Sequence, residues 1–345
     1  MNTTELVFER PERVFAREPP EVRGRSRDDV RLLVTRSDGH HHARFEDLPT
    51  FLGRGDLLVV NESAAIPASL PAQGRLGSIL LNLCTRFRSD LWIAEPRWAA
   101  GKPGPMPIEP GEEFRIGSAA VRLLSPYPGI PRLWFALADQ PFESVIAERG
   151  GPIHYGYTEA WPMDVYQTLF SRVPGSAEMP SAARPITSRI VERLHAAGVG
   201  IAPILLHAGV SSLEIESRSV EGQAMYPEPF DVPAATADAV NRTHADGGRV
   251  VAVGTTVVRA LESAWTPEGL RPSTGFTRLF VNPDRGVHAI DGLLTGFHDP
   301  VTSHLALLAA FLGMDRVREA YAEAIRNGYL WHEFGDSHLV LSGAN

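Results

Sequence analysis

The sequence predicts an α/β protein whose larger domain is interrupted by a small all-β domain. In residues 1–66 and 143–345, apolar strand-like runs alternate with segments of helical periodicity, which is the pattern of an α/β sheet. In residues 67–142, short apolar runs are separated by Gly- and Pro-rich turns with no helical pattern among them, which is typical of a barrel or a sandwich. The 345 residues suffice for two units with a core each.

The larger domain is expected to start with a charged, Pro-rich lead-in and then to alternate strands and helices. Its strands combine β-branched residues with leucine, and its helices carry apolar residues three and four positions apart. The expected strands are 30–35, 56–61, 199–206, 249–253 and 337–341, and the expected helices are 188–197, 233–244, 256–265, 305–312 and 316–326. The small domain is expected to contain strands at 79–83, 91–94, 119–124 and 133–137.

Composition excludes several classes of protein. The chain carries 33 Lys and Arg against 41 Asp and Glu, a net charge of −8, which argues against a non-specific cationic coat for nucleic acid. The single cysteine, Cys84, rules out an internal disulfide and a zinc site of the Cys-pair type. The longest apolar run, 305–314, is far shorter than a membrane span, and the first residues lack a signal-peptide pattern. We therefore expect a cytoplasmic enzyme without a membrane partner.

The strongest local signal is RVVAVGTTVVRALESAW, a buried strand that runs directly into a helix. Gly254 permits the tight turn, and a threonine, Thr255 or Thr256, is expected to cap the helix, whose first N–H groups suit a carboxylate or a phosphate. Crevices at the carboxyl ends of strands are where open α/β sheets bind ligands. An ordinary capped helix with a surface ion pair between Arg259 and Glu262 fits the same spacing equally well.

Three titratable residues in predicted loops are candidates for acid/base work. His298 precedes a helix, Asp336 precedes the last strand, and Glu228 lies in the Pro-bracketed loop 226–229. The alternative for Asp336 is an ordinary turn aspartate. His207 ends a strand, where a satisfied structural histidine is the more common outcome.

Other histidines raise the question of a metal. His298, His304, His332 and His338, with Asp299 and Glu333, could converge on a new site, but their spacing matches no metal motif. Gly254-Thr255-Thr256 lacks the lysine and the further glycines of a phosphate-binding loop. No metal is therefore expected.

Taken together, these segments resemble the S-adenosylmethionine:tRNA ribosyltransferase-isomerases of the queuosine pathway. The resemblance is collinear from about residue 31 to residue 341, nearly the whole chain. The family patterns DLL-V-N, IPA, YQT, LHVG, VGTT-VR-LES, NFH-P and GDA are matched by 56–61, 66–68, 166–168, 206–209, 253–263, 297–300 and 335–337 respectively.

The resemblance implies a fold and a reaction. The fold is a larger α/β sandwich domain, 1–66 together with 143–345, interrupted by a small antiparallel β-barrel domain, 67–142. The reaction transfers the ribosyl part of S-adenosylmethionine to the aminomethyl group of a 7-deazaguanine base in tRNA. Adenine and methionine leave, and an epoxycyclopentanediol forms. S-adenosylmethionine is thus a substrate, and the oligomeric state is not implied.

The resemblance also suggests roles for the matching residues. A sulfonium acidifies the neighbouring C5′–H, so a base can remove that proton, and departing adenine benefits from an acid. His298, Asp336 and Glu228 are the candidates for these proton steps. Gly254, Thr255 and Thr256 could hold the methionine carboxylate or a tRNA phosphate, and Tyr166 could face the sulfonium. The remaining expected substrate-binding residues are Asn61, Gln167, Thr168, His207 and Arg259.

The sequence departs from the family pattern at several polar positions. The departures include arginines and histidines of the family that are replaced here by Ala64, Ser69, Pro185, Tyr226 and Leu330, and the changed positions Gly296, Asp299, Val301 and 211–213. The family arginines that this sequence lacks are of the kind expected to contact phosphate or carboxylate groups. Two interpretations follow: a divergent tRNA ribosyltransferase-isomerase, or a paralogue that keeps the fold and the sulfonium pocket but acts on a small-molecule acceptor.

Overall fold

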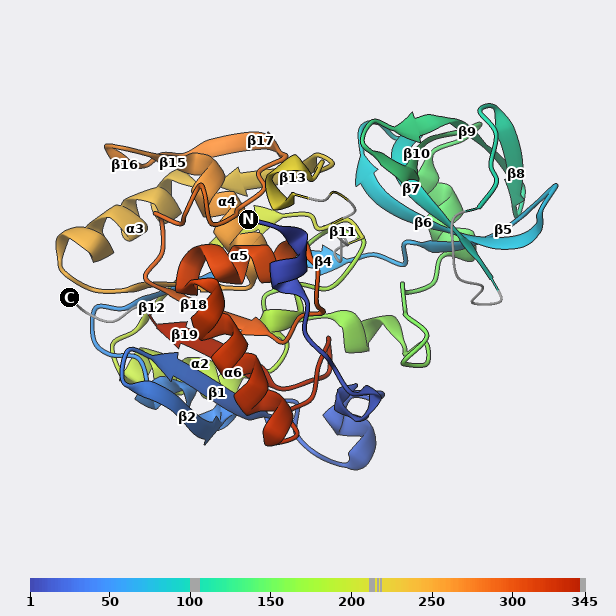
Figure 1. Ribbon diagram of the computed structural model, residues 1–345. Helices are drawn as coiled ribbons and strands as arrows, with labels where there is room; N and C mark the ends of the chain where they lie inside the picture. Colours follow the sequence, from blue (N-terminus) through green and yellow to red (C-terminus); the bar gives the residue numbers. More distant parts are fainter. Residues whose placement is uncertain (100–105, 211–214, 216, 218, 342–345) are drawn as a thin grey trace.

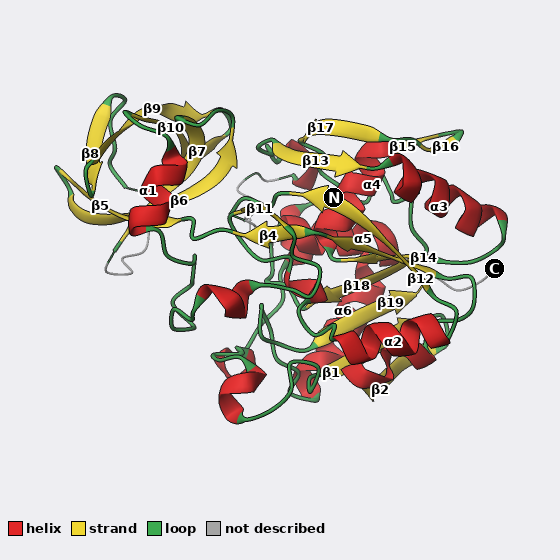
Figure 2. Cartoon of the chain, turned by 180° about the vertical axis from the view of Figure 1, so that it is seen from behind, coloured by secondary structure: helices red, strands yellow, loops and turns green. Residues whose placement is uncertain are grey.

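The computed structural model describes residues 1–99, 106–210, 215, 217 and 219–341. Figures 1 and 2 show a large α/β part with a barrel beside it. The predicted fold class is confirmed, because a large mixed sheet covered by helices is joined to a closed antiparallel barrel. The changed segment 211–213 lies outside the described residues.

The large part is built on one nine-stranded mixed sheet. Strand β3 lies near its centre, with β12 and β14 parallel to it on either side, and β18 continues this parallel group next to β14. In sheet order the strands are β17 (Ser273–Thr277), β13 (Glu228–Val232), β12 (Gly200–Leu206), β3 (Leu57–Asn61), β14 (Val250–Val253), β18 (Gly292–Gly296), β19 (Ser337–Leu341), β1 (Arg31–Arg36) and β2 (Gly39–Arg44).

Helices cover both faces of this sheet. On β3, Val59 packs into the core beneath one set of helices and Val60 into the core on the opposite face, as the two-residue period of a strand requires. The first face is covered by α3 (Ala234–Ala245), α4 (Thr255–Ala264), α5 (Ser303–Leu312) and α6 (Met314–Arg326), and the second by α2 (Ser188–Ala196) and the 3-10 turn η4 (Phe45–Thr50). Because both faces are buried, β3 and β14 read as continuous apolar runs.

The barrel closes six antiparallel strands around its own apolar core. In barrel order they are β10 (Ile130–Ala138), β7 (Leu91–Trp98), β6 (Gly77–Arg86), β5 (Ser69–Gly74), β8 (Glu112–Ile116) and β9 (Ala119–Tyr127), and α1 (Phe142–Arg149) follows. Sequence analysis missed β5 and β8, because β5 contains Pro71 and β8 has only two apolar residues. The exact domain limits at 66/67 and 142/143 stay a prediction.

The remaining elements are short. The Pro-rich lead-in forms the 3-10 turns η1 (Thr3–Leu6), η2 (Glu12–Val14) and η3 (Pro20–Arg23), and Phe15 pairs with Trp331. Two small sheets pair β4 (Ser63–Ala65) with β11 (Val173–Ser176) and β15 (Trp265–Thr266) with β16 (Gly269–Leu270), and the other 3-10 turns are η5 (Met163–Tyr166), η6 (Ser181–Ala183) and η7 (Val220–Gly222). Within the described ranges, no helix is long and apolar enough to cross a membrane.

Candidate active site

A cleft opens at the carboxyl ends of the parallel strands of the sheet. Ala208 follows β12, Gly254 follows β14 and His298 follows β18, and all three residues line this cleft. Because these strands are parallel to one another through β3, their carboxyl ends meet at one edge. We call it the main cleft; its other lining residues are Tyr155, Tyr157, 178–182, 255–256, 295–297, Asp299, His304, His332 and Glu333.

The start of α4 forms one wall of the main cleft. The N-cap of the helix is Gly254 with φ +100° and ψ 154°, so the expectation of a threonine cap is wrong. Thr255 and Thr256 instead lie in the first turn and line the cleft. Asn61 supports this wall from the end of β3, since its side-chain amide contacts the Thr256 hydroxyl at 3.4 Å and donates to the Leu206 carbonyl at 2.8 Å.

Two histidines lie together in the main cleft. The rings of His298 and His304 are 4.6 Å apart, and His298 Nε2 is 2.8 Å from the hydroxyl of Thr295 on β18. Burial holds the pKa of His298 well below its usual value. Burial, followed by the charge of Arg259, lowers the pKa of His304 to about 4. Both imidazoles are therefore neutral near pH 7, and His298 is available to accept a proton.

Three members of an aromatic stack, Phe15–His332–Tyr157–Tyr155, form a second wall of the main cleft: His332, Tyr157 and Tyr155. The ring centroids of Tyr157 and His332 are 4.2 Å apart, those of Phe15 and His332 5.0 Å, and those of Tyr155 and Tyr157 6.0 Å, all with nearly parallel planes. His332 has φ 72°, a conformation uncommon for a residue other than glycine and typical of functional positions. Sequence analysis named His332 but missed Phe15, Tyr155 and Tyr157, because these come from two distant segments with no shared spacing.

Carboxylates accompany the stack. The Tyr157 hydroxyl donates to Glu333 Oε2 at 2.6 Å, and the Tyr155 hydroxyl donates to Glu178. Burial raises the pKa of Glu333. Among the described residues, the lining contains no arginine or lysine. The main cleft thus combines aromatic faces with carboxyl groups, a lining that favours a cationic ligand.

A smaller cavity, the side chamber, adjoins the main cleft. Ala208, Thr255, Thr256 and His304 line both spaces. Its other lining residues are Met225, Tyr226, Glu228, Arg259, 279–281, Ser303 and Leu307.

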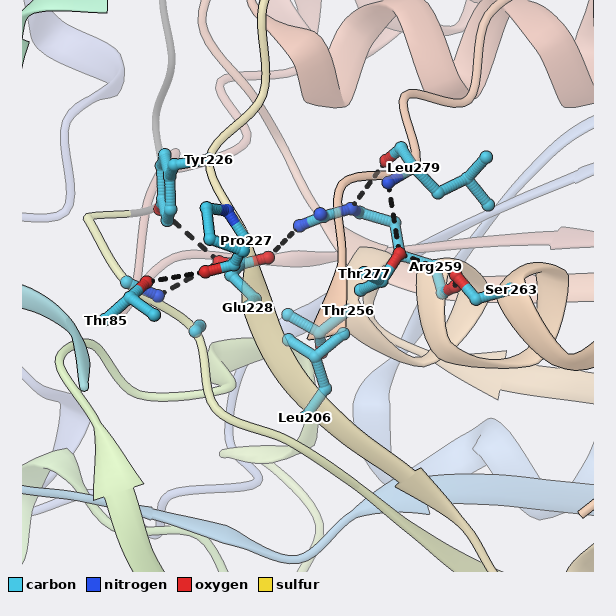
Figure 3. A network of polar contacts seen from close by, with 12 residues as sticks. Thr85, Leu206, Tyr226, Pro227, Glu228, Thr256, Arg259, Ser263, Thr277 and Leu279 are labelled. Carbon is cyan, nitrogen blue, oxygen red and sulfur yellow. Dashed lines mark hydrogen bonds and ion pairs between the residues drawn. The ribbon is translucent and has the colours of Figure 1, made fainter. Parts of the chain in front are cut away.

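The side chamber corrects two expectations about charged residues. Glu228 is not in a loop but is the first residue of β13, buried, and it forms an ion pair with Arg259 on α4 (Figure 3). Arg259 therefore does not pair with Glu262. Glu262 instead accepts hydrogen bonds from Arg285 at 2.5 Å and from the backbone N–H of Ala289 at 2.7 Å.

Asp336 lies outside both spaces. Its carboxylate accepts hydrogen bonds from the Arg31 and Leu330 backbone N–H groups at 2.7 and 2.8 Å and forms an ion pair with the Arg31 guanidinium at 2.8 Å. It lines a separate hollow with Arg31 and is not brought together with His298. His338 also points elsewhere, with its Nε2 2.8 Å from the Thr35 hydroxyl.

The predicted binding residues of segment 166–168 do not line the main cleft or the side chamber. The side-chain amide of Gln167 accepts a hydrogen bond from the Ala65 N–H at 3.1 Å and donates one to the Ala65 carbonyl at 2.9 Å. The Thr168 hydroxyl accepts from the Phe170 N–H at 3.2 Å. Tyr166 lines a small hollow that shares Glu178, Met179 and Glu333 with the main cleft.

His207 does not line the main cleft; it lines a different hollow together with Cys84 and Gly175. Its Nδ1 is 2.7 Å from the Ser63 hydroxyl, and burial lowers its pKa. It packs against Gly175, where an added Cβ would lie 2.5 Å from the ring. This arrangement is that of a structural histidine.

Asp299, one of the departures from the family pattern, has a partner in the lead-in. Its carboxylate forms an ion pair with Arg10, whose guanidinium also lies 4.2 Å from the centre of the Phe15 ring. No group of three metal-ligating side chains occurs in the part of the chain that the structure describes.

The chain is similar to known proteins over almost its whole length. The model of a family described as "Queuosine biosynthesis protein" matches residues 3–340. A protein of Moorella thermoacetica is 36% identical over 351 residues, covering 99% of this chain and 100% of that protein. A protein of Thermus thermophilus is 38% identical over 330 residues, covering 91% and 93%. Both are named S-adenosylmethionine:tRNA ribosyltransferase-isomerase.

A solved structure is also similar. The crystal structure of S-adenosylmethionine tRNA ribosyltransferase from Thermotoga maritima matches with a TM-score of 0.55 and 28% identity, covering 98% of this chain and 100% of that one. The similarity spans the large part and the barrel alike.

Proposed function

The chain belongs to the family of queuosine biosynthesis proteins, and on that premise we propose that it is an S-adenosylmethionine-dependent tRNA ribosyltransferase-isomerase. It transfers the ribosyl part of S-adenosylmethionine to the aminomethyl group of 7-aminomethyl-7-deazaguanine in tRNA. Adenine and methionine are released. The near-complete coverage of relatives with this name supports this interpretation over the small-molecule paralogue.

The observation that carries the proposal is the lining of the main cleft. S-adenosylmethionine is a sulfonium cation, and the acceptor carries an amine that is protonated in water. The aromatic stack offers ring faces, and Glu178 and Glu333 offer carboxyl groups, with no arginine or lysine among the described lining residues. Both cations gain from such surroundings, and the gain is larger once water is displaced.

His298 is the proposed general base. The sulfonium acidifies C5′–H, and a neutral imidazole can take that proton, leaving an ylide. Burial keeps the imidazole of His298 neutral near pH 7. Glu333 is the proposed acid for departing adenine, because burial raises its pKa and so favours its protonated form. Glu228 and Asp336 are not retained for proton transfer, since each is held in an ion pair away from the stack.

The charge of the main cleft limits how tRNA is bound. Phosphates would be repelled by the Glu178 carboxylate and would meet no arginine or lysine among the described lining residues, so only the modified base enters the cleft and the backbone is held outside it. The first turn of α4, with Thr255 and Thr256, remains the place for a carboxylate at the inner end.

The test is adenine release from S-adenosylmethionine with and without tRNA bearing the 7-aminomethyl-7-deazaguanine base. We expect release that depends on this tRNA, and a fall of about 100- to 10,000-fold in kcat for His298→Gln. His195→Gln, at an exposed histidine of α2, is the matched control and should release adenine normally. Adenine release that does not depend on tRNA would overturn the proposed function. Full activity of His298→Gln would overturn the role of His298 as the general base.

A further inference from the structure

We propose that Arg259 in the side chamber binds the α-carboxylate of the methionyl part of S-adenosylmethionine. This inference rests on the proposed function and deepens it. It assigns the two ends of the substrate to two adjoining spaces: the nucleoside and sulfonium to the main cleft, and the amino-acid tail to the side chamber.

One nitrogen of the Arg259 guanidinium has no hydrogen-bond partner among the described residues. Arg259 Nε donates to the Leu279 carbonyl at 3.0 Å, and Nη1 is paired with Glu228 (Figure 3). The third nitrogen, Nη2, is buried and has no hydrogen-bond partner among the described residues. A buried charged donor without an acceptor is costly, so the guanidinium is arranged for an acceptor that arrives from outside the protein.

The side chamber that Arg259 lines is mostly apolar. Met225, Leu279, Phe280, Val281 and Leu307 make most of its wall apolar. The chamber is small, and its guanidinium is paired on one side with Glu228. It therefore fits only the end of a short aliphatic chain that carries a carboxylate, because the chain loses contact with water and the carboxylate gains a charged donor.

The main cleft and the side chamber adjoin each other. Thr255, Thr256 and His304 line both the main cleft and the side chamber. A sulfonium held beside the aromatic stack can therefore extend its amino-acid chain past the first turn of α4 toward Arg259. The positive end of the helix favours the same carboxylate.

Glu228 then becomes a positioning residue. Its Oε1 accepts from the Gly209 N–H at 3.0 Å and lies 3.3 Å from the Tyr226 hydroxyl, and its other oxygen holds Arg259. These contacts hold the guanidinium in place, while Nη2 keeps no partner among the described residues. Glu228 thus acts through Arg259 rather than on the reacting atoms.

The experiment compares two ligands that differ in one group. Decarboxylated S-adenosylmethionine keeps the nucleoside, the sulfonium and the amine but lacks the carboxylate. We expect the wild-type protein to bind S-adenosylmethionine about 10- to 100-fold more tightly in calorimetry, the range typical of a hydrogen-bonded charge. In Arg259→Gln the two affinities should converge to within about threefold.

Controls separate this inference from stability and from the proposed function. Arg285→Gln removes another buried ion pair of α4, with Glu262, but does not line either space, so it should keep the preference for the carboxylate. If Arg259→Gln fails to fold, Arg259→Lys is measured instead. This variant keeps the positive charge and should retain only part of the preference for the carboxylate. An unchanged preference in a folded Arg259 variant overturns the inference; binding of neither ligand by the wild-type protein overturns the proposed function and the inference with it.

The positioning role of Glu228 has its own readout. Glu228→Gln should raise the KM for S-adenosylmethionine about tenfold and leave kcat within about threefold, because it loosens Arg259 without touching the reacting atoms. A fall of 100-fold or more in kcat at saturating substrate would instead assign Glu228 to proton transfer.

Discussion

Gly254 shows how a single residue fixes the wall of the site. Its φ of +100° with ψ of 154° lies in a region open only to glycine, although a Cβ there would meet nothing closer than 3.4 Å. Gly254→Ala should therefore lower the free energy of unfolding by about 1–3 kcal/mol through backbone strain. Chemical denaturation measures this, with Gly53→Ala, at a glycine with open space and no positive φ, as control. Equal effects at both positions would contradict the argument.

Asp336 illustrates the opposite case, a suspected acid that the fold uses for support. Asp336→Asn should weaken the ion pair with Arg31 and cost about 2 kcal/mol of stability. Since Asp336 lies outside the main cleft, kcat of the folded variant should stay within about threefold of the wild-type value. Adenine-release kinetics below the unfolding temperature measure this. A 100-fold loss of kcat would restore Asp336 as a catalytic residue.

Residue types were easier to predict than residue partners. The position of Gly254 at the end of a strand followed from local pattern, because that strand has a clear apolar run; His298 was predicted only in a loop before a helix, and the strand that it follows, β18, was not predicted. The pairing of Arg259 with Glu228 rather than Glu262 did not, since it depends on β13 returning beside α4. Spacing along one helix can propose a pair but cannot weigh it against a buried partner from another strand.

The aromatic stack is the element that most shapes the main cleft. Tyr157 offers its ring to a cation and its hydroxyl to Glu333. Tyr157→Leu should raise the KM for S-adenosylmethionine by about 3- to 30-fold, the range of a cation–π contact. Tyr157→Phe keeps the ring and should change KM less, so the pair separates the two contributions. If the two variants raise KM equally, the hydroxyl rather than the ring is responsible.

At the scale of elements, sequence patterns located the strands with long apolar runs and missed those with short ones, including β18, although it is buried on both faces. The buried strands β3 and β14 were found because both their faces are covered by helices. Strands β5 and β8 were missed because a barrel strand needs only one apolar face, and Pro71 further masks β5. The closure of the barrel depends on these two strands and so came from the family resemblance.

At the scale of the whole molecule, four histidines, of which His338 is fully buried and the other three are partly buried, make stability depend on pH. Burial lowers the pKa of His304 to about 4 and the pKa values of His332 and His338 to about 3, and it also lowers the pKa of His298. The unfolded chain binds these protons near pH 6.5 while the folded protein stays neutral. The free energy of unfolding should therefore fall as pH drops from 6.5 toward 4, by up to about 1.4 kcal/mol per pH unit per histidine.

Urea unfolding at pH 7.5, 6 and 5 measures this dependence. His338→Gln should make the slope shallower by the share of one histidine, because His338 is fully buried and lies outside the main cleft. A free energy of unfolding that stays constant from pH 7 to pH 5 would show that these histidines titrate normally in the folded protein.

The central claim is that this molecule, with its cation-binding cleft, modifies tRNA rather than a free small molecule. The most direct measurement is the mass of the nucleosides released from tRNA bearing 7-aminomethyl-7-deazaguanine after incubation with the purified protein and S-adenosylmethionine. The account predicts that this nucleoside is replaced by one that carries the added epoxycyclopentanediol group. Consumption of S-adenosylmethionine with the nucleoside left unchanged would contradict it.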